Sequence, residues 1–281
     1  MMRHRLTRAR ALPRAVLTAA AIVLALGGGA SVRIDAQRGA GPQPPRPAKA
    51  SAPVDLTGYW VSIVTQDWRW RMVTPPKGDY RGIPTTEEAR KVADTWDPAR
   101  DEAAGEACRA YGAPALMDVP GRIHITWQDD ETLKVDTDAG TQTRLLRFKS
   151  PAPAPRATRT WQGHSAAEWQ ISRPNVPLNL RPADRTPGVP PPAIGRGGSL
   201  KVVTTNLKAG YLRKNGVPYS ENAVLTEHWE VFTRDNGQQW LTITQVVEDP
   251  RFLRQPRLIA IPFKKEADGG KWEPTPCSAR W

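Results

Sequence analysis

Two histidines and one aspartate are the residues of this sequence best suited to proton transfer. His124, His228 and Asp136 all lie in runs where apolar and polar residues alternate. A histidine beside a carboxylate can accept and return a proton near neutral pH, as an isomerase, a cyclase or a hydrolase requires. Glu227 cannot share a site with His228, because neighbours in an extended chain point to opposite faces. One hypothesis is therefore a His–carboxylate site, and the alternative is that these residues are polar positions on the wall of a sheet.

The sequence does not indicate a metal or a cofactor. His124, His164 and His228 are far apart in the chain, so a zinc site would need three separate strands to bring them together. The phosphate-binding loop, the His-Glu-x-x-His motif and the Gly-x-Ser-x-Gly motif are all absent. Gly195-Arg196-Gly197-Gly198 follows Pro-rich sequence and precedes a predicted strand, which is not the context of a dinucleotide-binding turn. We expect no cofactor and no metal.

Tryptophan is unusually frequent, with 11 residues in the chain. Aromatic side chains fill the cores of sheets, but they also line cavities for flat or apolar ligands. The candidate ligand-binding residues are those that we expect to face the inside of a barrel: Tyr59, His124, Trp127, Arg144, Trp161 and Trp229. In this interpretation the indoles supply contact area, and a His or Arg side chain orients the ligand.

A long β-hairpin organises the elements that would position these residues. Two alternating runs, Ala223–Thr233 and Gln239–Glu248, flank Asp235-Asn236-Gly237. Asn-Gly favours the positive φ angles of tight turns, and period-two alternation of β-branched and aromatic residues is typical of strands. Such a hairpin cannot bury its apolar face alone. We therefore expect a larger antiparallel sheet around it.

Further alternating runs complete the predicted sheet. They lie at 56–65, 68–73, 121–128, 132–138, 141–149, 159–171, 199–207 and 258–265. One helix is expected near residues 85–96, where Thr85 and Glu88 have the spacing of a capping box and apolar residues recur at helical intervals. The predicted fold is mainly β, an antiparallel barrel of about 8–10 strands with one helix.

The amino-terminal residues have the pattern of a secretory signal peptide. Several arginines precede an apolar run, Ala15–Leu26, and small residues follow it, as in signal peptides that are cleaved after export. Cleavage after Ala36 is preferred, and cleavage after Ala30 is the alternative. Residues 1–36 are then the signal peptide, 37–53 a Pro-rich disordered linker, and 54–281 a single β-barrel domain with a Pro-rich loop at 173–198. The expected location is periplasmic or secreted, with no transmembrane segment after processing.

The basic charge gives little indication of a nucleic-acid partner. Loss of six Arg and one Asp with residues 1–36 lowers the net charge from +12 to +7. The remaining Lys and Arg are scattered, without the clustering that nucleic-acid binding requires. We expect no nucleic-acid partner. A contact with anionic surfaces of the cell envelope is compatible with this charge.

The only two cysteines, Cys108 and Cys277, both belong to the predicted domain. In an exported protein a pair of cysteines indicates a disulfide. The bond would join the carboxyl-terminal tail to the middle of the chain.

Leu56-Thr57-Gly58-Tyr59-Trp60 resembles the Gly-x-Trp motif that opens the first strand of lipocalins and other calycin barrels. The resemblance implies that Trp60 closes one end of a barrel, against an arginine such as Arg144 or Arg257, and that Gly58 allows a close chain approach. The alternative is that Trp60 is an ordinary core residue.

Most of residues 55–280 also resembles a family of exported bacterial proteins that has no assigned activity. The resembling stretches are Gly58–Asp79, Glu87–Asp97, Gly121–Arg144, Trp161–Ser165, Gly198–Thr205, Gly210–Thr226, Val247–Pro250 and Pro274–Cys277. This chain departs from the family pattern in its longer Pro-rich insertion.

Three functional hypotheses follow. The first is an exported lipocalin-like protein that binds an apolar or aromatic small molecule, or another accessory protein of the cell envelope. The second is an enzyme on the same barrel that uses His124 or His228 with Asp136. The third is a module that binds envelope glycans.

Overall fold

The structure, a computed structural model, describes residues 46–149, 153, 157–171 and 197–280. The predicted signal peptide, most of the predicted linker and nearly all of the Pro-rich loop therefore lie outside the described residues. The last part of the predicted linker is ordered. Residues Ala48–Ser51 form the short helix α1, in which Ala48 is buried and its carbonyl accepts a hydrogen bond of 2.8 Å from Trp169 Nε1.

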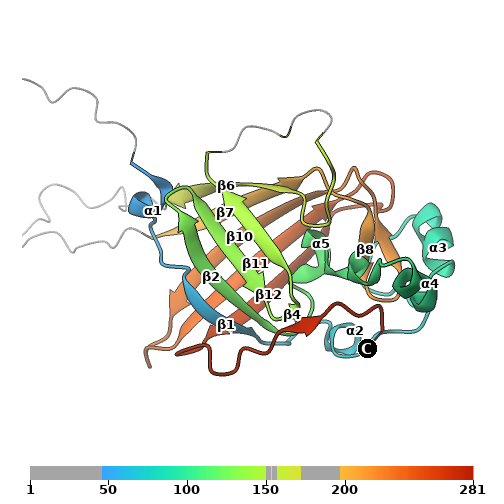
Figure 1. Ribbon diagram of the computed structural model, residues 1–281, viewed down its shortest axis with the longest axis horizontal. Helices are drawn as coiled ribbons and strands as arrows, with labels where there is room; N and C mark the ends of the chain where they lie inside the picture. The colour runs from blue at the N-terminus through green and yellow to red at the C-terminus, as the bar shows by residue number, and fades with distance from the viewer. Residues whose placement is uncertain (1–45, 150–152, 154–156, 172–196, 281) are drawn as a thin grey trace, which may run out of the picture. The chain divides into compact units, whose positions relative to one another are not determined.

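Nine strands close into one barrel (Figure 1). Around the barrel they are β1 (Gly58–Ser62), β12 (Arg257–Lys265), β11 (Gln239–Glu248), β10 (Val224–Thr233), β7 (Gly198–Thr205), β6 (His164–Ile171), β5 (Thr143–Arg147), β3 (Thr132–Thr137) and β2 (Arg122–Asp129). The prediction of a mainly β barrel with about 8–10 strands is confirmed.

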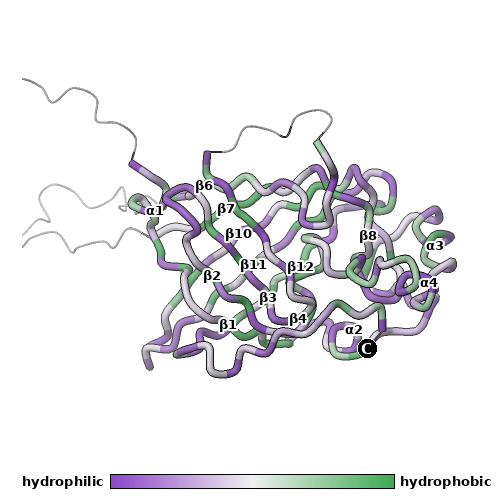
Figure 2. Tube along the Cα trace, in the orientation of Figure 1, coloured by the Kyte–Doolittle hydropathy of each residue, from purple (hydrophilic) through white to green (hydrophobic). Residues whose placement is uncertain are grey.

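The predicted hairpin is the longest pair of strands in the barrel. β10 and β11 pair from Val224 opposite Glu248 to Thr233 opposite Gln239, and Gly237 in the connection has a φ of 79°. Alternate residues of both strands are buried. Figure 2 shows the same alternation of hydrophobic and hydrophilic residues along the barrel strands. One face of each strand thus fills the barrel and the other faces outward.

The barrel is mixed and not purely antiparallel, which corrects the prediction. β5 and β6 run parallel, with Leu146 opposite Ser165 and Arg147 opposite Ala166. Parallel neighbours need a long crossover connection, whereas antiparallel neighbours can share a tight turn. The Pro-containing stretch between these two strands provides that length. The alternation of apolar and polar residues carries no information about the direction of a strand. The sequence pattern therefore could not show that β5 and β6 run parallel.

Short helices and a small hairpin gather at one end of the barrel, opposite the end where α1 lies (Figure 1). They are α2 (Trp68–Arg71), α3 (Glu87–Asp94), α4 (Pro98–Ala103), the 3-10 helix η1 (Ala107–Tyr111), α5 (Ala113–Leu116), and the hairpin of β8 (Gly210–Arg213) and β9 (Val217–Tyr219). We call this group the cap. None of the described helices is both long and apolar enough to cross a bilayer.

The single expected helix corresponds to α3, but the residue at its N-cap position differs from the prediction. Thr86, and not Thr85, is the N-cap, and its hydroxyl accepts a hydrogen bond from the backbone of Ala89. The helix α2 was not predicted. Residues 68–73 were expected to form a strand, whereas the carbonyl of Asp67, which has a positive φ, accepts hydrogen bonds from the amides of Trp70 and Arg71 and starts α2.

A disulfide joins the cap to the carboxyl-terminal tail. Cys108 in η1 is bonded to Cys277, which confirms the predicted pairing. Next to it, the two-residue strand β13 (Thr275–Pro276) pairs in parallel with β4 (Ala139–Gly140). The tail is therefore held by a covalent bond to the cap and by backbone pairing with β4.

Candidate functional site

The barrel interior is filled with side chains and is not the indole-lined hollow that we expected. Trp60, Trp229, Phe263 and their neighbours form one continuous buried cluster. Arg144 occupies part of the same space and is only 1% exposed. The large side chains needed to fill a barrel of nine strands are thus present in the middle of this one.

Arg144 belongs to a buried polar network inside the barrel. Its guanidinium forms two hydrogen bonds with the carboxylate of Glu227, at 3.0 and 2.5 Å. Gln245 donates to the same carboxylate at 2.9 Å, and Arg144 also contacts the Thr204 hydroxyl at 3.3 Å. A buried charge is tolerated when it is paired in this way. Arg144 therefore holds Glu227 in place with both terminal nitrogens, while its Nε and the Oε1 of Gln245 are buried without partners.

The other predicted ligand-binding residues do not converge. Tyr59 and His124 lie on the outer face of β1 and β2, because the intervening positions, such as Trp60, point inward. Trp229 is fully buried inside, and Trp127 packs against Phe148 at the α1 end. Trp161 lies outside the barrel strands and donates to the Ala209 carbonyl at 3.2 Å.

Tyr59 and His124 form an aromatic stack on the outside of the barrel. Their rings are parallel, with centroids 3.9 Å apart, and Trp272 of the tail meets both rings edge-on. Partial burial lowers the pKa of His124, although nearby Asp136 opposes this shift. The imidazole is thus covered by aromatic rings and favoured in its neutral form.

The structure brings together only two of the three residues proposed for proton transfer. His124 and Asp136 are opposite one another on β2 and β3. Asp136 already pairs with Lys134 at 2.9 Å and accepts from Thr143 at 2.6 Å. His228 lies on β10, which β5, β6 and β7 separate from β3. The described residues also include no group of three or more His, Cys, Asp or Glu side chains placed to hold a metal.

Gly58 and Trp60 lie where the first strand begins. Trp60 is fully buried, and its indole nitrogen donates to the Leu56 carbonyl at 2.9 Å. The Lys265 ammonium lies 5.1 Å from the centre of its ring. The two arginines considered for this contact pair elsewhere, Arg144 with Glu227 and Arg257 with Asp118.

A small cavity between the barrel and the cap has the chemistry of a binding site. Its charged lining consists of Asp67, Arg71, Asp118, Arg213, Lys214 and Arg257. Its apolar lining includes Ala110, Ala115, Val119 and Leu212. We call this cavity the basic pocket. It leaves about 30 Å³ for the centre of a water-sized molecule, whereas one water needs roughly 10–15 Å³. A few waters or one small ligand would fill it.

The arginines of the basic pocket come from three different elements. Arg71 ends α2, Arg213 ends β8, and Arg257 begins β12. They are 5%, 8% and 6% exposed. In the β8–β9 turn, Gly216 has a φ of 84°, and a Cβ there would lie 2.3 Å from Trp96. This turn and its close packing against the cap fix the position of Arg213.

Some of the side-chain N–H groups of Arg213 and Arg257 have acceptors. Arg213 donates to the Arg81 carbonyl at 2.9 Å and lies over the Trp70 ring at 5.0 Å. Arg257 pairs with Asp118 Oδ2 at 2.6 Å, but its second terminal nitrogen, Nη1, is buried without a partner. Burial and the charge of Arg257 lower the pKa of Arg213 to about 10. The four cationic side chains that line the pocket outnumber its two aspartates.

Arg71 is the most incompletely paired of these arginines. Its Nε donates to the Asp118 carbonyl at 2.9 Å, while both terminal nitrogens are buried and have no partner in the described structure. Burial lowers the pKa of Arg71, and Arg257 lowers it further, against the opposing effect of Asp118 and Asp67. Buried guanidinium groups are normally paired. An unpaired one at a cavity therefore indicates a place for an anionic ligand.

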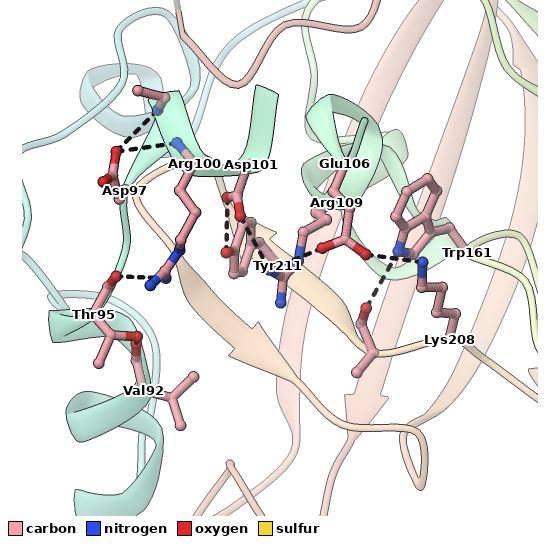
Figure 3. Close-up of polar contacts among 12 residues, drawn as sticks. Val92, Thr95, Asp97, Arg100, Asp101, Glu106, Arg109, Trp161, Lys208 and Tyr211 are labelled. Carbon is pink, nitrogen blue, oxygen red and sulfur yellow. Dashed lines mark hydrogen bonds and ion pairs between the residues drawn. The ribbon is translucent and has the colours of Figure 1, made fainter. Parts of the chain in front are cut away.

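In a neighbouring network within the cap, each charged side chain has a partner (Figure 3). Asp101 accepts from Tyr211 at 2.9 Å and from Arg109 at 3.1 Å. Glu106 joins Arg109 to Lys208, at 3.3 and 3.1 Å. The charges in this network are paired with one another, so it has the character of a structural cross-link between α4, η1 and the loop before β8.

Sequence reasoning missed the basic pocket for two reasons. Its residues are separated by up to 190 positions, between Asp67 and Arg257, and no spacing motif links them. Arg71 was also placed in a predicted strand, where its neighbours suggested an aromatic sheet face. The one signal present was the alternation of Trp and Arg at 68–71, which puts cations beside aromatic rings.

Comparison with known proteins gives no match. No family model fits the chain, and no curated protein or solved structure is significantly similar to it.

Proposed function

We propose that this chain is an exported binding protein that holds a small oxyanion, a carboxylate or a phosphate, in the basic pocket. The observation that carries the proposal is the guanidinium of Arg71, which is 5% exposed and has two terminal nitrogens without partners. Guanidinium groups bind carboxylates and phosphates with two parallel hydrogen bonds. The free nitrogen of Arg257 supplies a further donor from the opposite element.

The ligand chemistry differs from the apolar molecule that the tryptophans suggested. The pocket has four cationic and two anionic side chains in its lining, so it attracts negative charge. Its small volume favours a ligand of a few heavy atoms. The proposal keeps the binding role from the sequence analysis and moves it from the barrel interior to the capped end.

Export and a location in the periplasm or outside the cell are part of the proposal. The disulfide between Cys108 and Cys277 supports it, because such bonds persist in oxidising compartments. The signal-peptide pattern of residues 1–36 and the resemblance to exported bacterial proteins favour the same location.

Titration calorimetry tests the proposal at low ionic strength, with acetate and phosphate as the probes. The wild-type protein should bind one anion per chain. R71M should weaken binding by more than about 100-fold, because it removes two charge-assisted hydrogen bonds of roughly 1.5–3 kcal/mol each. R69M is the matched control, because Arg69 lies on the same short helix and is exposed. The absence of saturable binding, or equal binding by R71M, would refute the proposed function.

A further inference from the structure

Asp118 gives the basic pocket an acceptor as well as donors. Its Oδ2 pairs with Arg257, its carbonyl accepts from Arg71, and its Oδ1 is buried without a partner. The side chain of Asp118 is only 12% exposed. The unpaired oxygen therefore lacks both solvent and a protein donor, and a complete ligand must satisfy it.

A simple anion does not satisfy this arrangement. A ligand carboxylate can accept from Arg71 and Arg257, but its lone pairs would face the lone pairs of Asp118 Oδ1. A ligand that carries its own O–H group removes this conflict, because the hydroxyl donates to Oδ1 while the anionic group accepts from the arginines. A buried acceptor left unpaired is costly, so the pocket should distinguish strongly between the two kinds of ligand.

We propose that the ligand is a small 2-hydroxycarboxylate, whose hydroxyl donates to Asp118 and whose carboxylate is held by Arg71 and Arg257. This inference rests on the proposed function and specifies its ligand. Asp118 Oδ2 and Arg257 Nη2 are 2.6 Å apart. The unpaired atoms of the same two side chains, Asp118 Oδ1 and Arg257 Nη1, therefore offer an acceptor and a donor to two adjacent groups of a ligand. A 2-hydroxycarboxylate has its hydroxyl and its carboxylate on adjacent carbons and matches that pair.

The apolar lining favours a carbon compound over phosphate. Leu212 and Val119 contribute to the wall of the pocket together with two alanines. Hydrogen phosphate also combines an anionic oxygen with an O–H group, but it has no apolar surface to place against these side chains. The limited volume restricts the carbon part of the ligand to a few atoms.

Calorimetric titration of the wild-type protein with lactate and propionate gives the decisive comparison, because the two acids differ only in the hydroxyl group. Lactate should bind about 10-fold or more tightly than propionate, as expected for a site that hydrogen-bonds a substrate hydroxyl. Pyruvate, which has an acceptor in place of the hydroxyl, should bind more weakly than lactate. D118N should reduce or reverse the preference for lactate over pyruvate, because the amide can donate to the keto oxygen.

The possible outcomes separate this inference from the proposed function. Equal affinities for lactate and propionate would overturn the 2-hydroxycarboxylate and leave the anion site intact. Phosphate binding without lactate binding would have the same consequence. A lack of binding by all of these anions would overturn both. If D118N does not fold, the lactate-to-propionate ratio of the wild-type protein still decides.

Discussion

Replacement of Arg71 by Met has an unusual expected effect on stability. In the absence of an anion, R71M should unfold with a free energy within about 1 kcal/mol of the wild-type value. The wild-type residue gains one hydrogen bond from Nε to the Asp118 carbonyl, worth roughly 1.5–3 kcal/mol for a charged donor. It also buries two terminal nitrogens without partners, at a cost of about 1–3 kcal/mol for each unsatisfied group. In R71M the Asp118 carbonyl loses its donor, which costs about 1–3 kcal/mol more. With this loss included the contributions nearly cancel, and Met retains the aliphatic packing.

Urea unfolding in a buffer free of oxyanions measures this balance, and R257M is the contrasting variant. Arg257 pairs with Asp118 at 2.6 Å, so its removal leaves a carboxylate unpaired and should cost about 3–5 kcal/mol. With an anion at 100 times its Kd, the wild-type protein should gain about 2.7 kcal/mol, and R71M should gain much less. A loss of more than about 3 kcal/mol for R71M in anion-free buffer would show that Arg71 is a paired structural residue, and the reasoning would fail.

Two further predictions concern buried charges other than Arg71 and Arg257. R144M should destabilise the barrel by about 3–5 kcal/mol in urea unfolding, because it leaves Glu227 buried without its cation. The double variant R144M/E227L should recover much of that loss of stability. An equal loss in both variants would contradict this account. Burial lowers the pKa of Lys214 to about 8 from its ordinary value of 10.5, so the unfolded chain binds more protons than the folded chain between these two pH values. The free energy of unfolding should therefore rise from pH 8 to pH 10.5 more steeply for the wild-type protein than for K214M, and parallel pH profiles would show that Lys214 is not desolvated.

The strands were predictable because one face of each is buried. In β10 and β11 buried positions alternate, and all but Glu227 and Gln245 are apolar. The Asn-Gly turn between the two strands has a strong local preference. Direction and neighbour order depend on the connections, so the parallel pairing of β5 and β6 could not be read from the alternation. The helix α2 was misassigned because four residues rich in Trp satisfy a strand pattern and one helical turn equally well.

The prediction of an indole-lined hollow was wrong because large side chains occupy the interior of the barrel. Alternation correctly indicated that residues such as Trp229 and Arg144 face inward, but it cannot show how much of the interior they occupy. Both are almost completely buried, and the terminal nitrogens of Arg144 pair with Glu227. The cavity of the basic pocket lies instead where the cap meets the barrel, between residues that only the tertiary structure brings together.

Crystals of the wild-type protein soaked in arsenate would test the central claim most directly. Hydrogen arsenate is an oxyanion with an O–H group, and arsenic can be located by anomalous scattering. The anion site predicts one anomalous peak in the basic pocket, within hydrogen-bonding distance of the terminal nitrogens of Arg71 and of Arg257 Nη1. An empty pocket, or arsenic bound only elsewhere on the surface, would contradict the claim that these unpaired guanidinium groups form a binding site.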